Sequence, residues 1–330
     1  MAPRRTLLAT RQQIEAVFGI SDAVRCVEDA FRQYGEGKVR MPPKLYLTFE
    51  KGDLRCMPVY MPSLGIAGVK NVTVHPQNRD LPTVMALICL VEPETGFPLA
   101  VMDGTYITAL RTGAAGGVAA RCLARQDSQV AGFVGTGRQA HAQLAALRLT
   151  MPQIREVLAY DARPEAAEAF RRYCESKYGL KTSALQDPAE MVGACDVLIT
   201  TTPVLSPVVR SEWVRPGTHI NAIGADAPGK QELEGALLKR AVVVIDNWEQ
   251  ASHSGEINVP VSQGLIGPSD IHGDIGEVLT GRKPGRSSPD DITVFDSTGL
   301  AVQDVACAFE VYRRLTAPGR TSLDMGTAFF

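Results

Sequence analysis

The chain has 330 residues, and 45% of them are apolar, which is enough for two domains with substantial cores. Its formal net charge of -2 provides no basic surface for nucleic acid. The basic start MAPRR is not followed by a long apolar run, so we expect no signal peptide. No segment approaches the ~18 apolar residues of a membrane span, and we expect a cytoplasmic protein that needs no membrane.

Cysteines and histidines give no sign of a metal site. The seven cysteines form no CxxC pair, and the five histidines lack the spacing of metal ligands. An odd, scattered set of cysteines is typical of reduced, structural thiols. The sequence therefore predicts neither a metal nor a disulfide framework.

The first third of the chain predicts a helix followed by antiparallel strands. The stretch from Ser21 to Gly35 has apolar residues at helical spacing, with an early aspartate and a final glycine. LYLTFEKGDLRCMPVYM then alternates on a two-residue period around a Gly-Asp turn, followed by GIAGVKNVTV and by TVMALICLVEPETGFPLAVMD, where Pro-Glu-Thr-Gly is a hairpin turn. The small residues from Tyr106 to Leu123 predict a closely packed helix.

After this helix, strands and helices alternate. The apolar runs QVAGFV, EVLAY, DVLITTT, HINAIG, AVVVID and ITVFD are separated by helical stretches, including 164–177 and 188–193. This pattern is typical of an α/β fold with a Rossmann-type, doubly wound parallel sheet. We expect residues 126–299 to form that domain. Residues 1–125, with the final helix in 300–330, would form a second, α+β domain.

A dinucleotide fingerprint opens the alternating region. VAGFV leads into Gly135-Thr136-Gly137 and then into the helical stretch RQAHAQLAALRL, with Ala140 where a third glycine often stands. Such a turn aims free N–H groups and the positive end of a helix at a pyrophosphate. Asp161 closes the next strand, about 20 residues on, where a carboxylate can hold a ribose.

Asp161 also bears on the choice of cofactor. A carboxylate accepts a hydrogen bond from the ribose 2′-OH but repels a 2′-phosphate, so NAD is favoured over NADP. Arg163 keeps NADP open as an alternative, because an arginine two residues away can pair with that phosphate.

Four cations precede the fingerprint in apolar or turn-rich settings: Lys44, Arg55, Lys70 and Arg111. An isolated lysine or arginine is commonly a surface charge whose stem packs on apolar neighbours. Lys70 and Arg111 are the stronger candidates for a ligand site. Lys70 lies within a strand pattern, and Arg111 lies among alanines and glycines where a buried guanidinium needs an anionic partner.

Two further segments follow predicted strands of the parallel sheet. GADAPGKQEL places Asp226 at a turn, where it can move a proton or orient water, or simply cap the next helix. DSTG places Ser297 and Thr298 between a strand and a helix, where they can contact a ligand or act as caps.

Taken together, RMPPKLYL, KGDLRCMPVYMPSLGIAGVKNV, LPTVMALICLVEPETGFPLAVMDGTYITALRTGAAGG, GFVGTGRQA, GADAPGKQEL and ITVFDSTGLAVQDV resemble the ornithine cyclodeaminase/mu-crystallin family. The resemblance runs from about Leu7 to Leu315 and is strongest to the archaeal-type alanine dehydrogenase branch. It implies a homodimer in which the first domain, completed by the C-terminal helix, supplies the dimer interface and the substrate pocket.

The resemblance also implies roles for individual residues. Lys70 and Asp226 correspond to the catalytic residues. The substrate contacts would be Lys44, Arg55, Arg111 and Thr298. The cofactor contacts would be Thr83, Arg111, Gly135, Gly137, Arg138, Gln139, Asp161, Lys230 and Ser297.

The sequence thus predicts an NAD-dependent dehydrogenase that deaminates a small L-2-amino acid, alanine first, to its 2-oxo acid, with reductive amination as the reverse. One alternative is an NAD-requiring ornithine cyclodeaminase-type reaction, in which the substrate's own distal amine attacks the imine. A second is reduction of a cyclic imine such as pyrroline-2-carboxylate. A third is a protein that holds a dinucleotide and a small acid without turnover.

Overall fold

The computed structural model describes residues 4–318, and the chain divides into two compact units. Unit 1 comprises Met1–Arg111 and Leu300–Phe330, and unit 2 comprises Thr112–Gly299. The division falls inside helix α3 (Thr105–Leu123), the small-residue helix that the sequence predicts. The α/β fold class is confirmed.

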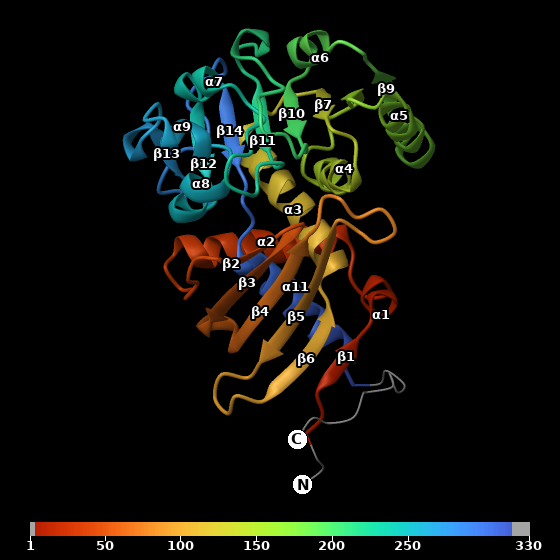
Figure 1. The fold of residues 1–330 in the computed structure, drawn as a ribbon, viewed down its shortest axis with the longest axis vertical. Coiled ribbons are helices and arrows are strands. Elements are labelled where there is room, and N and C mark those ends of the chain that lie inside the picture. Colours follow the sequence, from red (N-terminus) through yellow and green to blue (C-terminus); the bar gives the residue numbers. More distant parts are fainter. Residues whose placement is uncertain (1–3, 319–330) are drawn as a thin grey trace. The chain divides into compact units, whose positions relative to one another are not determined.

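Unit 1 is built on a six-stranded sheet with the order β1-β6-β5-β4-β3-β2 (Figure 1). Strands β2 to β6 are antiparallel, as predicted, whereas β1 runs parallel to β6 and had no sequence signal because it has only three residues. The strands are β1 Leu7–Ala9, β2 Leu45–Phe49, β3 Gly52–Met61, β4 Ile66–Val74, β5 Val84–Val91 and β6 Pro98–Asp103. The helices are α1 Arg11–Glu15, α2 Ile20–Gly35 and α11 Ala301–Leu315, with a 3₁₀ turn at Pro62–Leu64.

The β2–β3 turn differs from the prediction. Phe49 pairs with Gly52, so the turn is formed by Glu50 and Lys51 and not by Gly52-Asp53. Gly52 serves another purpose, because a Cβ there would lie 2.4 Å from the carbonyl oxygen of Val74. The glycine lets two strand backbones approach closely, which is the other common reason for glycine in a strand.

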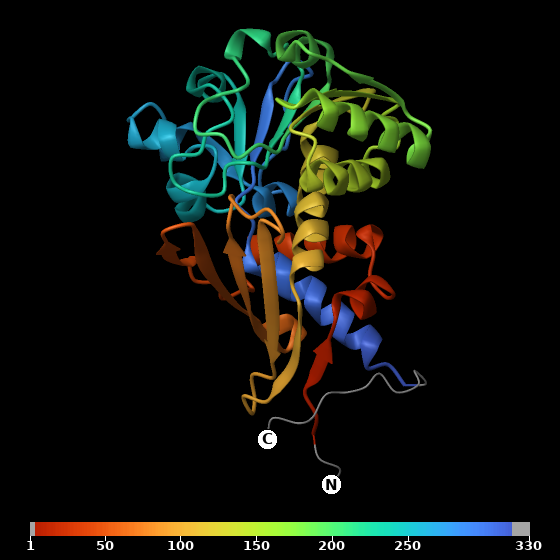
Figure 2. The same cartoon turned by 45° about the vertical axis from the view of Figure 1, so that its right-hand side comes forward.

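The two faces of this sheet have different surroundings. Helices α2 and α11 contact each other, and α11 packs along β3, β4 and β5, where Met57, Val59 and Ile88 are buried (Figure 2). The opposite face leaves Leu45, Leu47, Phe49 and Leu87 between 43% and 64% exposed. The two-residue alternation seen in the sequence therefore reflects one packed face and one open apolar face.

Unit 2 holds an eight-stranded, fully parallel sheet with the order β13-β12-β14-β11-β10-β7-β8-β9. Its strands are β7 Val130–Val134, β8 Glu156–Tyr160, β9 Lys181–Ala184, β10 Val197–Thr200, β11 His219–Ala222, β12 Val242–Ile245, β13 Ile271–Asp274 and β14 Thr293–Asp296. The outermost strands, β9 and β13, were not predicted. Their sequences KTSA and IHGD lack an apolar run because edge strands are only partly buried.

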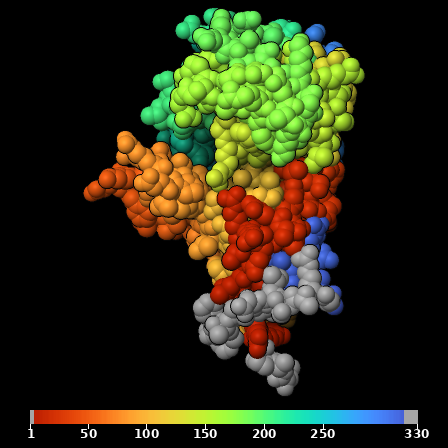
Figure 3. Space-filling model, turned by 90° about the vertical axis from the view of Figure 1, so that its right-hand side faces the viewer, coloured from red at the N-terminus to blue at the C-terminus, as the bar shows by residue number. Residues whose placement is uncertain are grey.

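Helices cover both faces of the parallel sheet, as the doubly wound prediction requires. They are α4 Arg138–Thr150, α5 Pro164–Tyr178, α6 Pro188–Ala194, α7 Gly235–Lys239, α8 Trp248–Ser254, α9 Asn258–Ser262 and α10 Ile275–Leu279, with 3₁₀ turns at Ser211–Trp213 and Pro268–Asp270. Phe133, Leu144 and Phe170 belong to one apolar core, and Leu198 and Val294 belong to another. Residues of α4 and α5, yellow-green in Figure 3, form much of the surface of unit 2 in that view.

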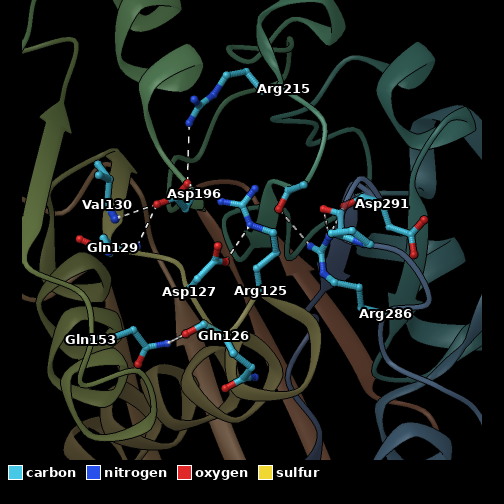
Figure 4. Close-up of polar contacts among 12 residues, drawn as sticks. Arg125, Gln126, Asp127, Gln129, Val130, Gln153, Asp196, Arg215, Arg286 and Asp291 are labelled. Carbon is cyan, nitrogen blue, oxygen red and sulfur yellow. Dashed lines mark hydrogen bonds and ion pairs between the residues drawn. The ribbon is translucent and has the colours of Figure 1, made fainter.

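A polar network ties together the amino ends of several strands of unit 2 (Figure 4). The carboxylate of Asp196 accepts hydrogen bonds from the N–H groups of Gln129 and Val130, at 2.9 and 3.1 Å, and from Arg125, at 2.9 Å. Arg286 donates to backbone carbonyls, including those of Leu123 and Gly217. These contacts close the edge of the sheet opposite to the strand ends at which parallel sheets bind ligands.

Candidate functional site

Two of the cations predicted in unit 1, Lys70 and Arg55, share one face of its sheet. Lys70 pairs with Met57 and Tyr46 pairs with Arg55, so Arg55, two residues before Met57, points to the same side as Lys70. This is the face on which α11 packs, and both Lys70 and Arg55 are buried. Lys44 lies just before β2, close enough for its charge to lower the pKa of Lys70.

Lys70 and Arg111 meet at one carboxylate, that of Asp304 on α11. Lys70 Nζ lies 2.7 Å from Asp304 Oδ2, and Arg111 Nε donates to Asp304 Oδ1 at 2.9 Å. Arg111 Nη1 also donates to Gln303 Oε1 at 3.2 Å. The side chains of Lys70 and Asp304 are 1% and 0% exposed, so the ion pairs are shielded from water. We call Lys70, Arg111 and Asp304 the charged triad.

The protonation of Lys70 is poised near neutrality. Burial of the ammonium and the nearby positive charge of Arg111 lower the pKa of Lys70 to about 7, although Asp304 opposes this shift. Lys44 lowers it further. A lysine that titrates near pH 7 can donate or accept a proton under physiological conditions, unlike an exposed lysine.

Arg55 has its own partners in the same sheet. Its Nε and Nη2 donate to the two carboxylate oxygens of Asp53 at 2.8 and 3.1 Å, and its guanidinium lies over the ring of Tyr46. A fork of this kind fixes the plane of the guanidinium. Arg55 is therefore held in one orientation while its neighbour Asp53 compensates its charge.

The nucleotide turn of unit 2 has the geometry that the fingerprint predicts. Gly135 has φ of 84°, and a Cβ there would lie 2.8 Å from Thr202 Cγ2. Gly137 is the N-cap of α4, and a Cβ there would meet nothing within 4 Å. Arg138 and Gln139 begin the helix, and Ala140 in its first turn is fully buried. Gly135 thus makes the turn, while Gly137 leaves open space at the helix N-terminus.

Asp161 braces this turn. Its Oδ2 accepts from the N–H and hydroxyl of Thr136 at 2.9 and 3.0 Å, and its Oδ1 accepts from the N–H of Arg163 at 3.0 Å. Burial opposes ionisation, but these hydrogen bonds prevail and lower the pKa of Asp161. The carboxylate is therefore charged at the end of β8. Oδ2 already accepts two hydrogen bonds, whereas Oδ1 accepts one from the described residues and retains room for a further donor.

Asp226 lies on the loop after β11 and is paired with Lys230. Lys230 Nζ is 2.5 Å from Asp226 Oδ1, and both side chains are partly exposed. Asn258 fixes this loop, because its amide accepts from the N–H of Gly229 and donates to the carbonyl of Lys230. The carboxylate predicted as a proton acceptor is thus held at the carboxyl end of the parallel sheet, on a braced turn.

Two buried glutamates order the same loops. Glu232 accepts from the hydroxyls of Thr200 and Thr202, at 2.6 and 2.7 Å, and from the N–H of Gly224, at 2.8 Å. Glu256 accepts from the N–H groups of Glu232 and Leu233. Burial raises the pKa of both carboxyls, and the charge of Glu232 raises that of Glu256 further. These contacts tie the loops that follow β10 and β11 to one point.

Ser297 and Thr298 follow β14 and differ in their surroundings. The Thr298 hydroxyl donates to Asp246 Oδ1 at 2.8 Å, and the N–H of Gly299 donates to Asp246 Oδ2 at 2.7 Å. Ser297 Oγ is buried and makes no hydrogen bond to the residues that the structure describes. Ser297 is therefore the better placed of the two hydroxyls to receive a ligand.

The structure brings together Lys44, Lys70 and Arg111 in unit 1, and Gly135, Gly137 and Asp161 in unit 2. Thr83 lies in unit 1, on the loop before β5, where its carbonyl accepts from His75. The sequence motifs did not identify five further polar residues around these sites: Gln303, Asp304, Asp246, Glu232 and Glu256. A signal for the first two existed, since QD interrupts the otherwise apolar start of the helix LAVQDVACAF.

The chain belongs to the ornithine cyclodeaminase/mu-crystallin family, which it matches over residues 4–318. It is 58% identical to the alanine dehydrogenase of Archaeoglobus fulgidus over 309 residues, covering 93% of this chain and 94% of that protein. The family predicted from the motifs is confirmed.

Solved structures agree with this membership. An archaeal alanine dehydrogenase dimer with bound NAD superposes with a TM-score of 0.94 at 55% identity, covering 99% of this chain and 100% of that one. The Δ1-pyrroline-2-carboxylate reductase of Thermococcus litoralis, in complex with NADH and L-proline, superposes with a TM-score of 0.91 at 36% identity, covering 94% and 97%.

Proposed function

We propose that the protein is an NAD-dependent dehydrogenase that deaminates a small L-2-amino acid, alanine first, to its 2-oxo acid and ammonia, reversibly. The observation that carries this proposal is the buried pair of cations, Lys70 and Arg111, beside Lys44. Lys70 and Arg111 share the single carboxylate of Asp304, and Lys44 lies close enough to lower the pKa of Lys70, so the surroundings suit an anionic ligand such as an amino-acid carboxylate. The high identity to an alanine dehydrogenase supports alanine as the first substrate to test.

The residues of unit 2 fit a dinucleotide. The space beside Gly137 at the N-terminus of α4 suits a pyrophosphate, and the charged Asp161 suits an adenosine ribose. Ser297 Oγ and Gln139 Oε1 are buried polar atoms without a hydrogen-bond partner among the described residues, and both suit a ligand that brings donors or acceptors. Arg138 and Lys230 would add positive charge near the phosphates, and Thr83 remains a candidate contact. Bound NAD would supply a hydride acceptor.

Each reacting group has a residue suited to it. Arg111, whose described hydrogen bonds use Nε and Nη1, would offer Nη2 to the substrate carboxylate together with Lys44 and Arg55. Loss of a hydride from Cα leaves an imine. Asp226 would take the proton of the water that attacks this imine, and Thr298 would contact the substrate. Lys70 would stabilise the negative charge that develops on the new oxygen as ammonia leaves.

Reduction of a cyclic imine is the second candidate, and the similarity to a pyrroline-2-carboxylate reductase favours it. The same carboxylate contacts serve a cyclic imino acid, and no attacking water is then needed. A cyclodeaminase would also begin with the imine but would use the substrate's distal amine as nucleophile. A non-catalytic binding protein is disfavoured because Lys70, Arg111 and Asp226 are all retained.

One experiment separates these reactions. The purified protein is offered NAD and a panel of L-amino acids, and reduced nicotinamide and ammonia are measured together. We expect one NADH for each ammonia with alanine. Ammonia without NADH from ornithine would indicate a cyclodeaminase, and NADH consumption with pyrroline-2-carboxylate but no reaction of alanine would indicate an imine reductase.

We also propose that the protein is a homodimer formed through the open face of the unit 1 sheet. Leu45, Leu47, Phe49 and Leu87 expose an apolar surface there, and such a surface commonly marks an interface. Light scattering at micromolar concentration should give the mass of a dimer, and Leu47→Asp should give a monomer. Leu205→Asp is the matched control, because Leu205 is 70% exposed but lies in unit 2. A wild-type monomer would contradict the proposal.

No helix within residues 4–318 could cross a membrane, and the cytoplasmic location stays a prediction.

A further inference from the structure

We propose that Asp304 is a positioning residue of the unit 1 site, which fixes the Lys70 ammonium and the Arg111 guanidinium by giving each its own carboxylate oxygen. The catalytic consequence of this role rests on the function proposed above. Asp304 lies in the first turn of α11 and is completely buried. The sequence motifs assigned it no role.

The geometry argues against direct contact between Asp304 and a substrate. Oδ2 is 2.7 Å from Lys70 Nζ and Oδ1 is 2.9 Å from Arg111 Nε, so both oxygens face cations. Because both oxygens are taken up in this way, an amino acid bound to Lys70 or Arg111 would meet the cations and not the aspartate. Asp304 therefore acts through the two cations.

Asp304 also determines which guanidinium nitrogen of Arg111 is available to a substrate. A carboxylate at Nε and the Gln303 amide at Nη1 hold the guanidinium plane from one side. The remaining Nη2 is then directed to one place, which preorganises the contact to a substrate carboxylate. Without Asp304, the side chain of Arg111 could rotate, and its fork would lose this fixed orientation.

The charge balance around Lys70 depends on the same carboxylate. The charged groups around it are Lys44 before β2, Arg111 on α3 and Asp304 on α11, while Arg55 on β3 is paired with Asp53. Cys307, one turn along α11, lies close enough to be influenced by Asp304 and Arg111. Asp304 favours the protonated lysine against burial and the charges of Arg111 and Lys44, so its loss should shift the titration of Lys70 to lower pH.

The test is an NMR titration of lysine labelled with ¹³C at Cε, in the full-length protein, with Lys70→Met identifying the Lys70 signal. We expect a Lys70 midpoint near 7 in the wild-type protein and a lower midpoint in Asp304→Asn. In steady-state kinetics with NAD and alanine, the alkaline limb of kcat/KM should move the same way, because the protonated lysine is the active form. Displacement of Arg111 should lower kcat/KM by up to about 10²-fold.

Asp22→Asn is the matched control. Asp22 on α2 pairs with Arg314 of α11 at 2.5 Å, so this variant loosens the same helix without touching the charged triad. It should leave the Lys70 midpoint and the KM for alanine unchanged. If Asp22→Asn shifts the midpoint as much as Asp304→Asn, or if Asp304→Asn shifts nothing, the positioning role is wrong.

Asp304→Glu covers the case in which Asp304→Asn does not fold. It keeps the charge but lengthens the side chain, so the Lys70 midpoint should stay near that of the wild type while kcat/KM falls. Unchanged kcat/KM in this variant would overturn the proposal. If the wild-type protein turns over no amino acid, the proposed function fails, yet the titration still decides the role of Asp304.

Discussion

The candidate sites of the two units are built in opposite ways. In unit 2 the nucleotide turn is local, because Asp161 braces Thr136 from 25 residues away and the key positions are glycines and backbone N–H groups. In unit 1 the site consists of buried charges, and Arg111 reaches its partner Asp304 across 193 residues of sequence. A backbone site depends on conformation and space, whereas a site of buried side chains depends on charge balance. Substitutions should therefore fail differently in the two units.

Replacement of Asp226 should have the largest effect on activity, because we assign to this side chain a proton transfer in the reaction itself. Asp226→Asn keeps the size of the side chain but removes the proton acceptor, so turnover with alanine should drop by about 10²–10⁴-fold. Binding of NADH, followed by its fluorescence, should be nearly unchanged. Asp187→Asn, which alters a helix cap on α6, is the control. Near-normal turnover in Asp226→Asn would leave only a structural role for this residue.

Arg111→Lys tests the charge-dependent site. A lysine keeps the positive charge but cannot donate to Asp304 and Gln303 and also present a fork to the substrate. The KM for alanine should rise by roughly 10-fold or more, with a smaller loss of kcat if Cα is displaced. Steady-state kinetics at saturating NAD measure both. An unchanged KM would separate Arg111 from substrate binding.

Substitutions of Gly135 and Gly137 test the nucleotide turn, which is formed by backbone groups. Gly135→Ala forces a side chain into a conformation with φ of 84° and against Thr202, so the protein should lose about 1–3 kcal/mol of stability even without NAD. Gly137→Ala meets open space and should melt like the wild type, but should bind NAD more weakly because the methyl group occupies the place of the phosphates. Thermal melting with and without NAD distinguishes the two. Equal loss of apo stability in both variants would contradict this division.

His219, in the core of unit 2, should make the stability of the protein depend on pH. It is completely buried between Thr293 and Asn221, and burial lowers its pKa from 6.5 to about 3. Above pH 6.5 both the folded and unfolded states hold it neutral. Below that, only the unfolded state takes up the proton, so stability should fall by up to about 1.4 kcal/mol per pH unit until pH 3.

Chemical denaturation between pH 7 and pH 5 measures this effect. His219→Gln should be less stable at pH 7 but should show a smaller decline with acid. His253→Gln, at an exposed histidine, should retain the wild-type slope. An unchanged slope in His219→Gln would assign the acid sensitivity to other groups.

Asp161 gives the smallest expected effect and concerns cofactor choice. Asp161→Ser removes the charge that repels a 2′-phosphate, so use of NADP relative to NAD should improve, by about tenfold or less. Since Asp161 also accepts from Thr136, NAD itself should bind more weakly. Arg163→Ala, at a side chain 71% exposed, should leave the preference for NAD intact. A wild-type preference for NADP would contradict the argument from this carboxylate.

The same contrast explains what the sequence could predict. Some elements are determined by residues that are neighbours in the sequence, so local patterns were enough to predict them. They are the nucleotide turn, the hairpin at Pro93–Gly96 and the helix ending at Gly35. Lys70 and Arg111 could be identified as candidates, but their shared counter-ion could not. Asp304 lies on a helix whose apolar pattern explains its packing, and only the fold brings that helix onto β4. Edge strands such as β9 stay hidden because they lack a buried apolar run.

The position of α11 at the end of the chain has a consequence for biosynthesis. Arg111 leaves the ribosome 193 residues before Asp304, a delay on the order of 10 to 40 s at ordinary elongation rates. Unit 2 is synthesised during that interval, and its interior strand β14 is made only shortly before Asp304. Throughout the interval, Lys70 and Arg111 of unit 1 lack the carboxylate with which they pair in the complete chain. A chain that terminates before α11 would have to leave Lys70 and Arg111 in water. The last helix thus makes completion of the polypeptide a condition for a closed core in unit 1.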